Sequence, residues 1–237
     1  MSMIRVVLLT ICIVILNGCA GTGTPNIHRL EAVGNYKEVI KIYKQKLAKS
    51  PNDSAILIEL SDAYSLAGDF NNAEFYINRI DSHRVKKLGR FYKIKGDIYL
   101  GLDQPNKAIQ SYLKSKENNY KNPELENGLG IAFAKINNLS RSNSSFSEAK
   151  LLNVNGTKVG NNIAVNLMRE HKYKEAISIL LPLYSQDKTV KTVKYNLGFS
   201  LLMVGAQSAA SEVLKPDFSD DQVMWLSNRI NSIKDEK

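Results

Sequence analysis

Cysteine and long apolar runs are scarce in this sequence, which limits both its chemistry and its relation to a membrane. The 237 residues contain two cysteines, Cys12 and Cys19, which are too few for a framework of disulfides. The apolar run Val6 to Leu16 is shorter than the roughly 18 residues that a membrane-spanning helix needs. A Gly- and Thr-containing segment follows it, so the chain is not expected to span a membrane.

Residue patterns of catalysis and metal binding are also missing. The three histidines, His28, His83 and His171, lie far apart in sequence, and none has a second ligand at helical metal spacing. The sequence has neither a G-x-S-x-G motif nor a phosphate-binding loop, and Gly128 with Gly130 indicates a small-residue packing site. We therefore expect no enzymatic activity, no cofactor and no metal.

The first residues have the layout of a secretory signal. Met1 to Arg5 carries one basic side chain, the apolar run follows, and Gly18, Cys19 and Ala20 are small. The order of residues 16–19, Leu-Asn-Gly-Cys, resembles a bacterial lipobox. The resemblance implies cleavage after residue 18 and acylation of Cys19, and two or more acyl chains hold a protein at a membrane firmly.

This resemblance also implies a location. Because Ala20 follows the cysteine where an Asp would favour the inner membrane, it favours the periplasmic face of the outer membrane. Residues 1–18 are thus predicted to be a lipoprotein signal peptide and residues 19–27 a lipidated tether.

Basic residues outnumber acidic ones, 32 to 23, and the sequence pI is about 9.4. A nucleic-acid surface would concentrate Lys and Arg on one element with aromatic residues between them. The densest basic stretch, Arg84 to Lys95, is better explained as a solvated helix face, and export makes nucleic acid an unsuitable partner. A basic surface that faces lipopolysaccharide, lipid headgroups or an acidic protein is the remaining interpretation.

Six turn-forming markers recur along the chain at nearly constant spacing. The intervals between them are 34, 35, 34, 34 and 34 residues, and the markers are Gly34, Gly68, Asp103, Asn137, His171 and Gly205. Gly, Asn and Asp tolerate the left-handed backbone that a tight turn between helices needs. The period therefore predicts a stack of helical hairpins.

Side-chain size follows the same period. Small residues stand seven positions before the last five markers: Ser61, Gly96, Gly130, Ala164 and Gly198. Large residues stand nine positions after all six: Tyr43, Ile77, Tyr112, Phe146, Leu180 and Leu214. Two antiparallel helices need this match if the bulky side chains of one are to fit where the other leaves room.

Period and pattern together resemble the tetratricopeptide repeat (TPR). Its L-G-x-x-Y and A-x-x-x-F cores correspond to Leu129, Gly130 and Phe133 and to Ala108 and Tyr112. The resemblance implies an all-α fold, a TPR solenoid in which antiparallel helix pairs form a right-handed superhelix over residues 28–216. It would hold one partial and five full repeats, which start near Ser54, Lys87, Pro123, Thr157 and Lys191.

Residues 217–237 are predicted to form a capping helix and tail. Ser219 and Gln222 have the spacing of a capping box. An apolar stripe of Val223, Leu226, Ile230 and Ile233 would then cover the last repeat. At the junction of the first two full repeats, Lys95 replaces an apolar residue, and we expect looser packing there.

In TPR solenoids the first helix of each pair lines a concave groove. Eight residues are predicted to bind a protein partner there: Lys93, Asn127, Lys135, Asn162, Arg169, Tyr195, Asn196 and Phe199. Asn162 and Asn196 occupy equivalent places, where an amide can donate to and accept from an extended peptide backbone. Arg169 would bind an acidic group of the same segment.

The last two repeats carry a further resemblance. The segments "NNIAVNLMREHKYKEAISILLPLY" (161–184) and "VKYNLGFSLLMVGAQSAASEVL" (193–214) are similar to the TPR lipoproteins of tight-adherence (Tad, or Flp) pilus assembly. This implies a non-enzymatic outer-membrane factor whose partner is the secretin or another pilus-assembly component. Two alternatives stay open: a pilotin or adaptor of another secretion or envelope machine, and a scaffold that recruits peptidoglycan hydrolases.

Overall fold

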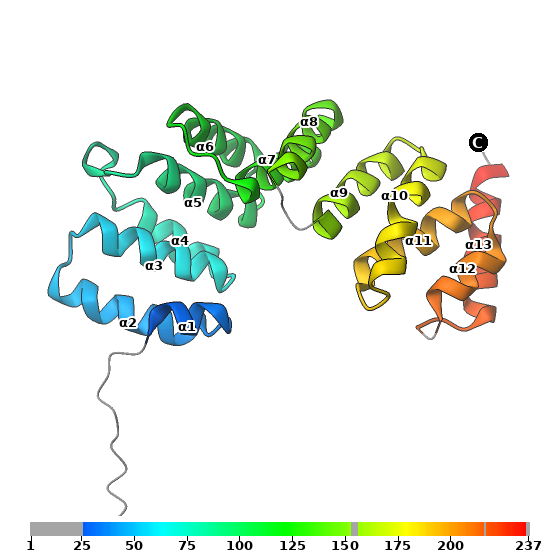
Figure 1. Ribbon diagram of the computed structural model, residues 1–237, viewed down its shortest axis with the longest axis horizontal. Helices are drawn as coiled ribbons and strands as arrows, with labels where there is room; N and C mark the ends of the chain where they lie inside the picture. The colour runs from blue at the N-terminus through cyan, green and yellow to red at the C-terminus, as the bar shows by residue number, and fades with distance from the viewer. Residues whose placement is uncertain (1–25, 153–155, 216, 236–237) are drawn as a thin grey trace, which may run out of the picture.

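The computed structural model describes residues 26–152, 156–215 and 217–235, and within these ranges it contains helices and no strands (Figure 1). The predicted signal peptide, the lipidation site Cys19 and residues 20–25 of the tether lie outside the described residues. The elements are α1 (Ile27–Ala32), α2 (Tyr36–Lys49), α3 (Ser54–Leu66), α4 (Phe70–Ile77), the 3₁₀ turn η1 (Ser82–Arg84), α5 (Leu88–Gly101), α6 (Pro105–Glu117), α7 (Pro123–Lys135), α8 (Leu139–Leu151), α9 (Gly156–Arg169), α10 (Tyr173–Gln186), α11 (Lys191–Met203), α12 (Gln207–Leu214) and α13 (Asp220–Asp235).

The helices pair as the period predicts. Five full pairs run from α3/α4 to α11/α12, a short pair α1/α2 precedes them, and α13 follows. The helices that open the full pairs begin at Ser54, Leu88, Pro123, Gly156 and Lys191, each within one residue of its predicted start. The all-α solenoid with a C-terminal capping helix is therefore confirmed.

All six markers adopt the left-handed backbone that the turns require. Gly34, Gly68 and Gly205 have φ of 69°, 79° and 81°, and Asp103, Asn137 and His171 have φ of 56°, 60° and 59°. His171 is the least expected of them, because its residue type does not favour this conformation as strongly as Gly or Asn. The repeat therefore imposes the turn geometry even where the residue type is less suited to it.

Small residues on the first helices provide the space that large residues on the second helices fill. A Cβ added at Gly96 would lie 2.5 Å from the Tyr112 ring, and one added at Gly130 would lie 2.5 Å from the Phe146 ring. A Cβ added at Gly128 would lie 2.5 Å from the hydroxyl oxygen of Tyr112. The prediction that Gly128 and Gly130 form a packing site is therefore confirmed.

The first helices also pack against each other from repeat to repeat. Contacts join α3 to α5, α5 to α7, α7 to α9, α9 to α11 and α11 to α13. Figure 1 shows the result as an arch, with α5, α7 and α9 on its inner side and α6, α8 and α10 on its outer side. The first helices thus form the concave layer, because they lie closer together than the second helices.

Helix α13 caps the C-terminal end. The backbone N–H of Ser219 donates to Gln222 Oε1 at 2.9 Å, and that of Gln222 donates to Ser219 Oγ at 3.3 Å, so the capping box is confirmed. Val223 is buried and contacts the α12 core, with Leu226 and Ile230 partly buried beside it. The prediction is wrong for the last residue of the stripe, because Ile233 is 45% exposed. Helix α12 has 8 residues and α13 has 16, so α12 is too short to cover the whole length of α13.

The junction between the first two full repeats is irregular, as Lys95 indicates. The turn η1 replaces the usual link, and a pocket of about 610 Å³ opens beside it. Lys95 Nζ lies over the rings of Phe91 and Tyr99, at 5.9 and 5.8 Å from their centres. Burial, together with the nearby Lys114, lowers the pKa of Lys95.

Candidate functional site

The concave face begins with a cluster of charged side chains from α3 and α5. Arg90 donates to both carboxylate oxygens of Glu59 at 2.6 and 2.9 Å and to Asp62 Oδ2 at 2.8 Å. Lys93 Nζ lies 2.7 Å from Asp97 Oδ2. The predicted groove residue Lys93 is therefore on this face and is paired within its own helix.

Burial shapes the protonation of this cluster. Burial raises the pKa of Asp62 above its ordinary value, and Arg90 offsets only part of that effect. Burial opposes the charged form of Lys93, but the Asp97 carboxylate outweighs it and raises the pKa of Lys93. The cluster thus pairs three carboxylates with two cations, and a charged ligand would have to compete with these internal pairs.

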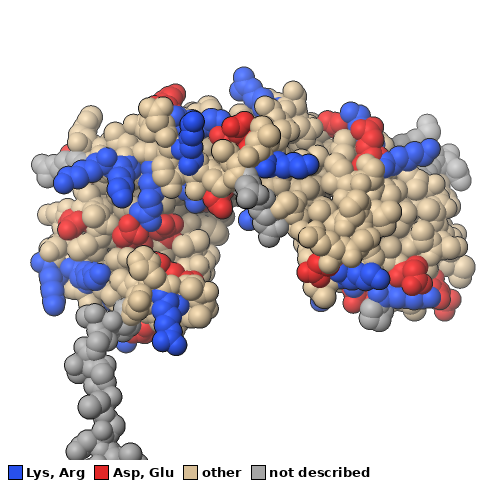
Figure 2. All heavy atoms as spheres, viewed as in Figure 1, with Lys and Arg blue, Asp and Glu red and all other residues tan. Residues whose placement is uncertain are grey.

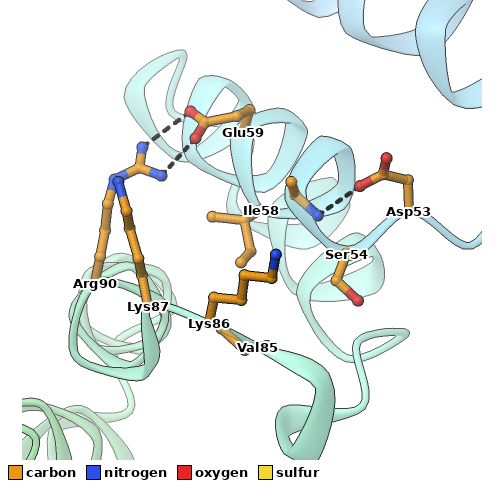
Figure 3. Close-up of a pocket in the computed structure, with 9 residues that line it drawn as sticks. Asp53, Ser54, Ile58, Glu59, Val85, Lys86, Lys87 and Arg90 are labelled. Atoms are coloured by element: carbon orange, nitrogen blue, oxygen red, sulfur yellow. Dashed lines mark hydrogen bonds and ion pairs between the residues drawn. The ribbon is translucent and has the colours of Figure 1, made fainter.

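The pocket beside this cluster lies between the N-terminal ends of α3 and α5 (Figure 3). Ile58 and Val85 give it an apolar wall, and Lys86 and Lys87 add positive charge. Figure 3 shows Arg90 and Glu59 meeting at one end of the pocket and Asp53 and Ser54 at the other. Asp53 caps α3 by accepting the backbone N–H groups of Ala55 and Ile56, at 2.8 and 3.2 Å. Such a pocket suits a side chain with an apolar stem and a polar end.

The middle of the concave face carries pairs of amides. Asn162 on α9 donates to Asn127 Oδ1 on α7 at 3.0 Å, and Asn196 on α11 donates to Asn161 Oδ1 on α9 at 2.9 Å. Asn127 is 5% exposed, whereas the other three asparagines are partly exposed. An amide has two N–H donors, so Asn162 and Asn196 each keep one N–H and a carbonyl oxygen for a ligand.

Two of the predicted basic residues lie at the C-terminal ends of the first helices. Arg169 donates to the backbone oxygen of Ala134 at 2.7 Å and to Asn137 Oδ1 at 3.2 Å, which ties α9 to the end of α7. Lys135 donates to Asp103 at 2.7 Å in the same way, one repeat earlier. Both side chains therefore hold neighbouring repeats together, and the role of Arg169 toward an acidic ligand stays a prediction.

Aromatic side chains gather at the C-terminal end of this face. The Tyr195 hydroxyl donates to Asp217 Oδ2 at 3.0 Å, and its ring meets Phe218 edge to face at 5.9 Å. Phe199 is 43% exposed and contacts Tyr173 in the same manner at 6.2 Å. The predicted residues Tyr195 and Phe199 are therefore both accessible to a partner.

Sequence reasoning missed Trp225, the one tryptophan of the chain. It is 65% exposed and lines a pocket of about 340 Å³ with Phe218, Asp221, Gln222 and Leu226. The signal was available, because Trp225 falls outside the buried stripe of α13 and on the same helix side as Asp221 and Gln222. The role of Asp217, which accepts from Tyr195 and pairs with Lys194, had no such signal.

Two negative findings concern the described ranges. No three His, Cys, Asp or Glu side chains come close enough there to share a metal ion. No helix in those ranges has both the length and the apolar character needed to cross a membrane.

Known proteins share this architecture. Residues 30–98 match the family model of the tetratricopeptide repeat. The structure is similar to YrrB, described as a TPR protein with an unusual peptide-binding site, with a TM-score of 0.57 and 18% identity over 77% of this chain and 90% of that chain. Curated protein sequences gave no match.

Two further solved structures agree. A TPR protein from Parabacteroides merdae has a TM-score of 0.64 and 16% identity, over 89% of this chain and 84% of its own. A thermophilic TPR protein from Thermus thermophilus has a TM-score of 0.60 and 16% identity, over 74% of this chain and 95% of its own. The fold of this protein is thus that of a TPR solenoid.

Proposed function

We propose that this protein is a lipid-anchored scaffold whose concave face binds an extended segment of a protein partner. In this proposal the lipid is carried by Cys19 at the periplasmic face of the outer membrane. The partner is the secretin or another component of a Tad/Flp pilus-assembly system, and the protein helps that component to assemble or keeps it stable. The binding acts without catalysis.

The observation that carries the proposal is the order of side chains along one continuous layer of first helices. Charged groups on α3 and α5 come first, amides on α7, α9 and α11 follow, and aromatic rings on α11 and in the link before α13 end the series. An extended segment laid along this face would meet amides for its backbone and aromatic rings for its apolar side chains. YrrB, which has the same fold, is described as having a peptide-binding site, and this supports the same use here.

Capture from solubilised envelope tests the choice of partner. The tagged protein is expected to recover a secretin or pilus-assembly component, identified by mass spectrometry. Recovery of peptidoglycan hydrolases without either component would replace the proposal by a hydrolase scaffold. Recovery of parts of a different secretion machine would replace it by a pilotin or adaptor of that machine.

The amide pairs give a sharper test of the groove. Asn162→Ala with Asn196→Ala removes both partly exposed amides, and the affinity for the captured partner should fall by about 5- to 150-fold, because two hydrogen bonds are lost at about 0.5–1.5 kcal/mol each. Titration calorimetry with the purified partner measures this.

Asn161→Ala is the matched control, because Asn161 is not among the eight predicted groove residues. It breaks the interhelical hydrogen bond to Asn196 but leaves Asn162 and Asn196 in place. The control should keep most of the affinity. Unchanged affinity in the first variant would remove the groove from the proposal.

A further inference from the structure

The N-terminal end of the solenoid exposes one long side of α2. Helix α1 has 6 residues and α2 has 14, so α1 covers only part of its partner. Val39 and Leu47 are the buried residues of α2, and Leu47 belongs to the core of the first full repeat. On its other side, α2 borders a shallow groove of about 440 Å³.

Lysines line this exposed side. Lys37, Lys41 and Lys44 are exposed, lie at helical steps of four and three, and surround Ile40 along the shallow groove. We call these three residues the α2 lysine stripe. Lys41 pairs with Glu38 at 3.0 Å, whereas neither Lys37 nor Lys44 is in an ion pair with any residue that the structure describes.

The end of the molecule that carries the stripe is basic as a whole. Residues 27–49 contain six Lys or Arg and two Glu. Figure 2 shows blue side chains at this end, at the lower left of the molecule. Long Lys side chains can lay their methylene stems on apolar surface while the ammonium groups reach outward, which is the arrangement that Ile40 and the stripe offer.

We propose that the α2 lysine stripe rests on anionic phospholipid headgroups of the membrane that holds the lipid anchor. This inference rests on the anchoring in the proposed function. Six residues lie between Cys19 and Asn26, and the seven Cα–Cα steps that join the two residues span on the order of 25 Å at most. The tether therefore keeps α2 near the bilayer, and attraction acts within a Debye length of about 8 Å. Contact through α2 leaves the concave face free for the partner.

Amine modification of the lipidated full-length protein tests the contact. The protein is placed on vesicles of phosphatidylcholine alone or of phosphatidylcholine with phosphatidylglycerol, and each lysine's modification rate is read by mass spectrometry. Lys37, Lys41 and Lys44 should react several-fold more slowly on the anionic vesicles, while Lys121 and Lys150, which are exposed elsewhere, should not change. The protection should vanish at about 1 M salt, where the Debye length is about 3 Å.

Flotation separates this inference from the anchoring on which it rests. Failure to float with neutral vesicles would disprove the lipid anchor, and the stripe is then tested by flotation with anionic vesicles. There, replacing all three stripe lysines by Gln should weaken binding on the order of 100-fold, at about fivefold per lysine. Gln at Lys121, Lys150 and Lys174 is the charge-matched control and should bind like wild type. Equal modification rates on both vesicles, or equal binding by both triple variants, would overturn the proposal.

Discussion

At the scale of single residues, Tyr112 links the core to the concave face. Its side chain is fully buried, and its ring occupies the space that Gly96 and Gly128 leave on two neighbouring helices. Its hydroxyl donates to Asp97 Oδ1 at 2.7 Å, and Asp97 in turn pairs with Lys93. One side chain thus joins the packing of two repeats to the charged cluster of the candidate site.

The titration of Tyr112 predicts a loss of stability at high pH. Burial raises the pKa of Tyr112 far above its usual value, and the Asp97 carboxylate adds to the effect. The raised pKa of Tyr112 contributes its full stabilisation below the pKa of tyrosine in the unfolded chain, which is about 10. The contribution is lost as the pH rises above that value, because only the unfolded chain then releases the proton. The free energy of unfolding should fall by about 1.4 kcal/mol per pH unit through this residue.

Tyr112→Phe provides the comparison for this prediction. Urea unfolding should be measured between about pH 9 and about pH 11. The free energy of unfolding should fall less steeply with pH in the variant, by about 1.4 kcal/mol per pH unit. At neutral pH the variant should be less stable by about 1–3 kcal/mol, because Asp97 loses a buried donor. Identical slopes in the two proteins would contradict the prediction.

At the scale of elements, each repeat depends on the fit of a small residue against a large one. Phe146 on α8 is 1% exposed, and its ring occupies the space above Gly130 on α7. Gly130→Ala should lower the free energy of unfolding by about 1–2 kcal/mol, because overpacking outweighs the higher helix propensity of Ala. Chemical denaturation of the purified variant measures this difference.

Two further variants test whether the Phe146 ring causes the loss of stability in Gly130→Ala. Gly156→Ala places the same methyl group where, apart from the adjoining backbone, no atom of the described residues lies within 4 Å, and it should not destabilise the protein. Combining Gly130→Ala with Phe146→Leu should cost less than the two separate losses added together, because the smaller side chain makes room for the methyl group. Additive losses would show that the two positions do not interact.

At the scale of the whole molecule, the junction between α8 and α9 joins two repeats through buried polar side chains. Asn166 is 1% exposed and donates to Ser142 Oγ at 2.8 Å and to Asn143 Oδ1 at 2.7 Å. Ser142 donates onward to the backbone oxygen of Gly130 at 2.7 Å. The buried apolar residues here are few, namely Phe146, Ala149 and Val159, so hydrogen bonds carry much of the contact between the two halves of the arch.

Asn166→Ala is therefore expected to separate the melting of the two halves. The variant loses two buried hydrogen bonds, about 1–3 kcal/mol together, at a single interface between repeats. Because a solenoid is held together by contacts between neighbouring repeats, weakening one of them reduces the cooperativity of the whole. Hydrogen exchange should show α9 to α13 opening at a different free energy from α3 to α8. Asn231→Ala, on the exposed side of α13, should leave one transition, and a single unchanged transition in Asn166→Ala would refute the expectation.

Much of this fold was predictable because the same local residue pattern recurs in every repeat. The left-handed turns, the small and large partners and the capping box each depend on residues within one hairpin or one helix turn. Even the turn at His171, which its residue type favours less, follows from its place in the period. Of the candidate site, the sequence placed Asn162, Asn196, Tyr195 and Phe199 on first helices, where the structure has them, and their binding of a partner stays a prediction.

By itself, then, the sequence determined the hairpins, their number and the face that each first helix presents, since all of these follow from spacing along one chain. The tertiary structure alone decided which groups meet across repeats: Asn162 with Asn127, Asn196 with Asn161, Arg169 with the end of α7, and the exposure of Trp225. The physical reason is that these contacts depend on the rotation between successive repeats. That rotation results from the packing of whole helices, and a period of 34 residues does not encode it.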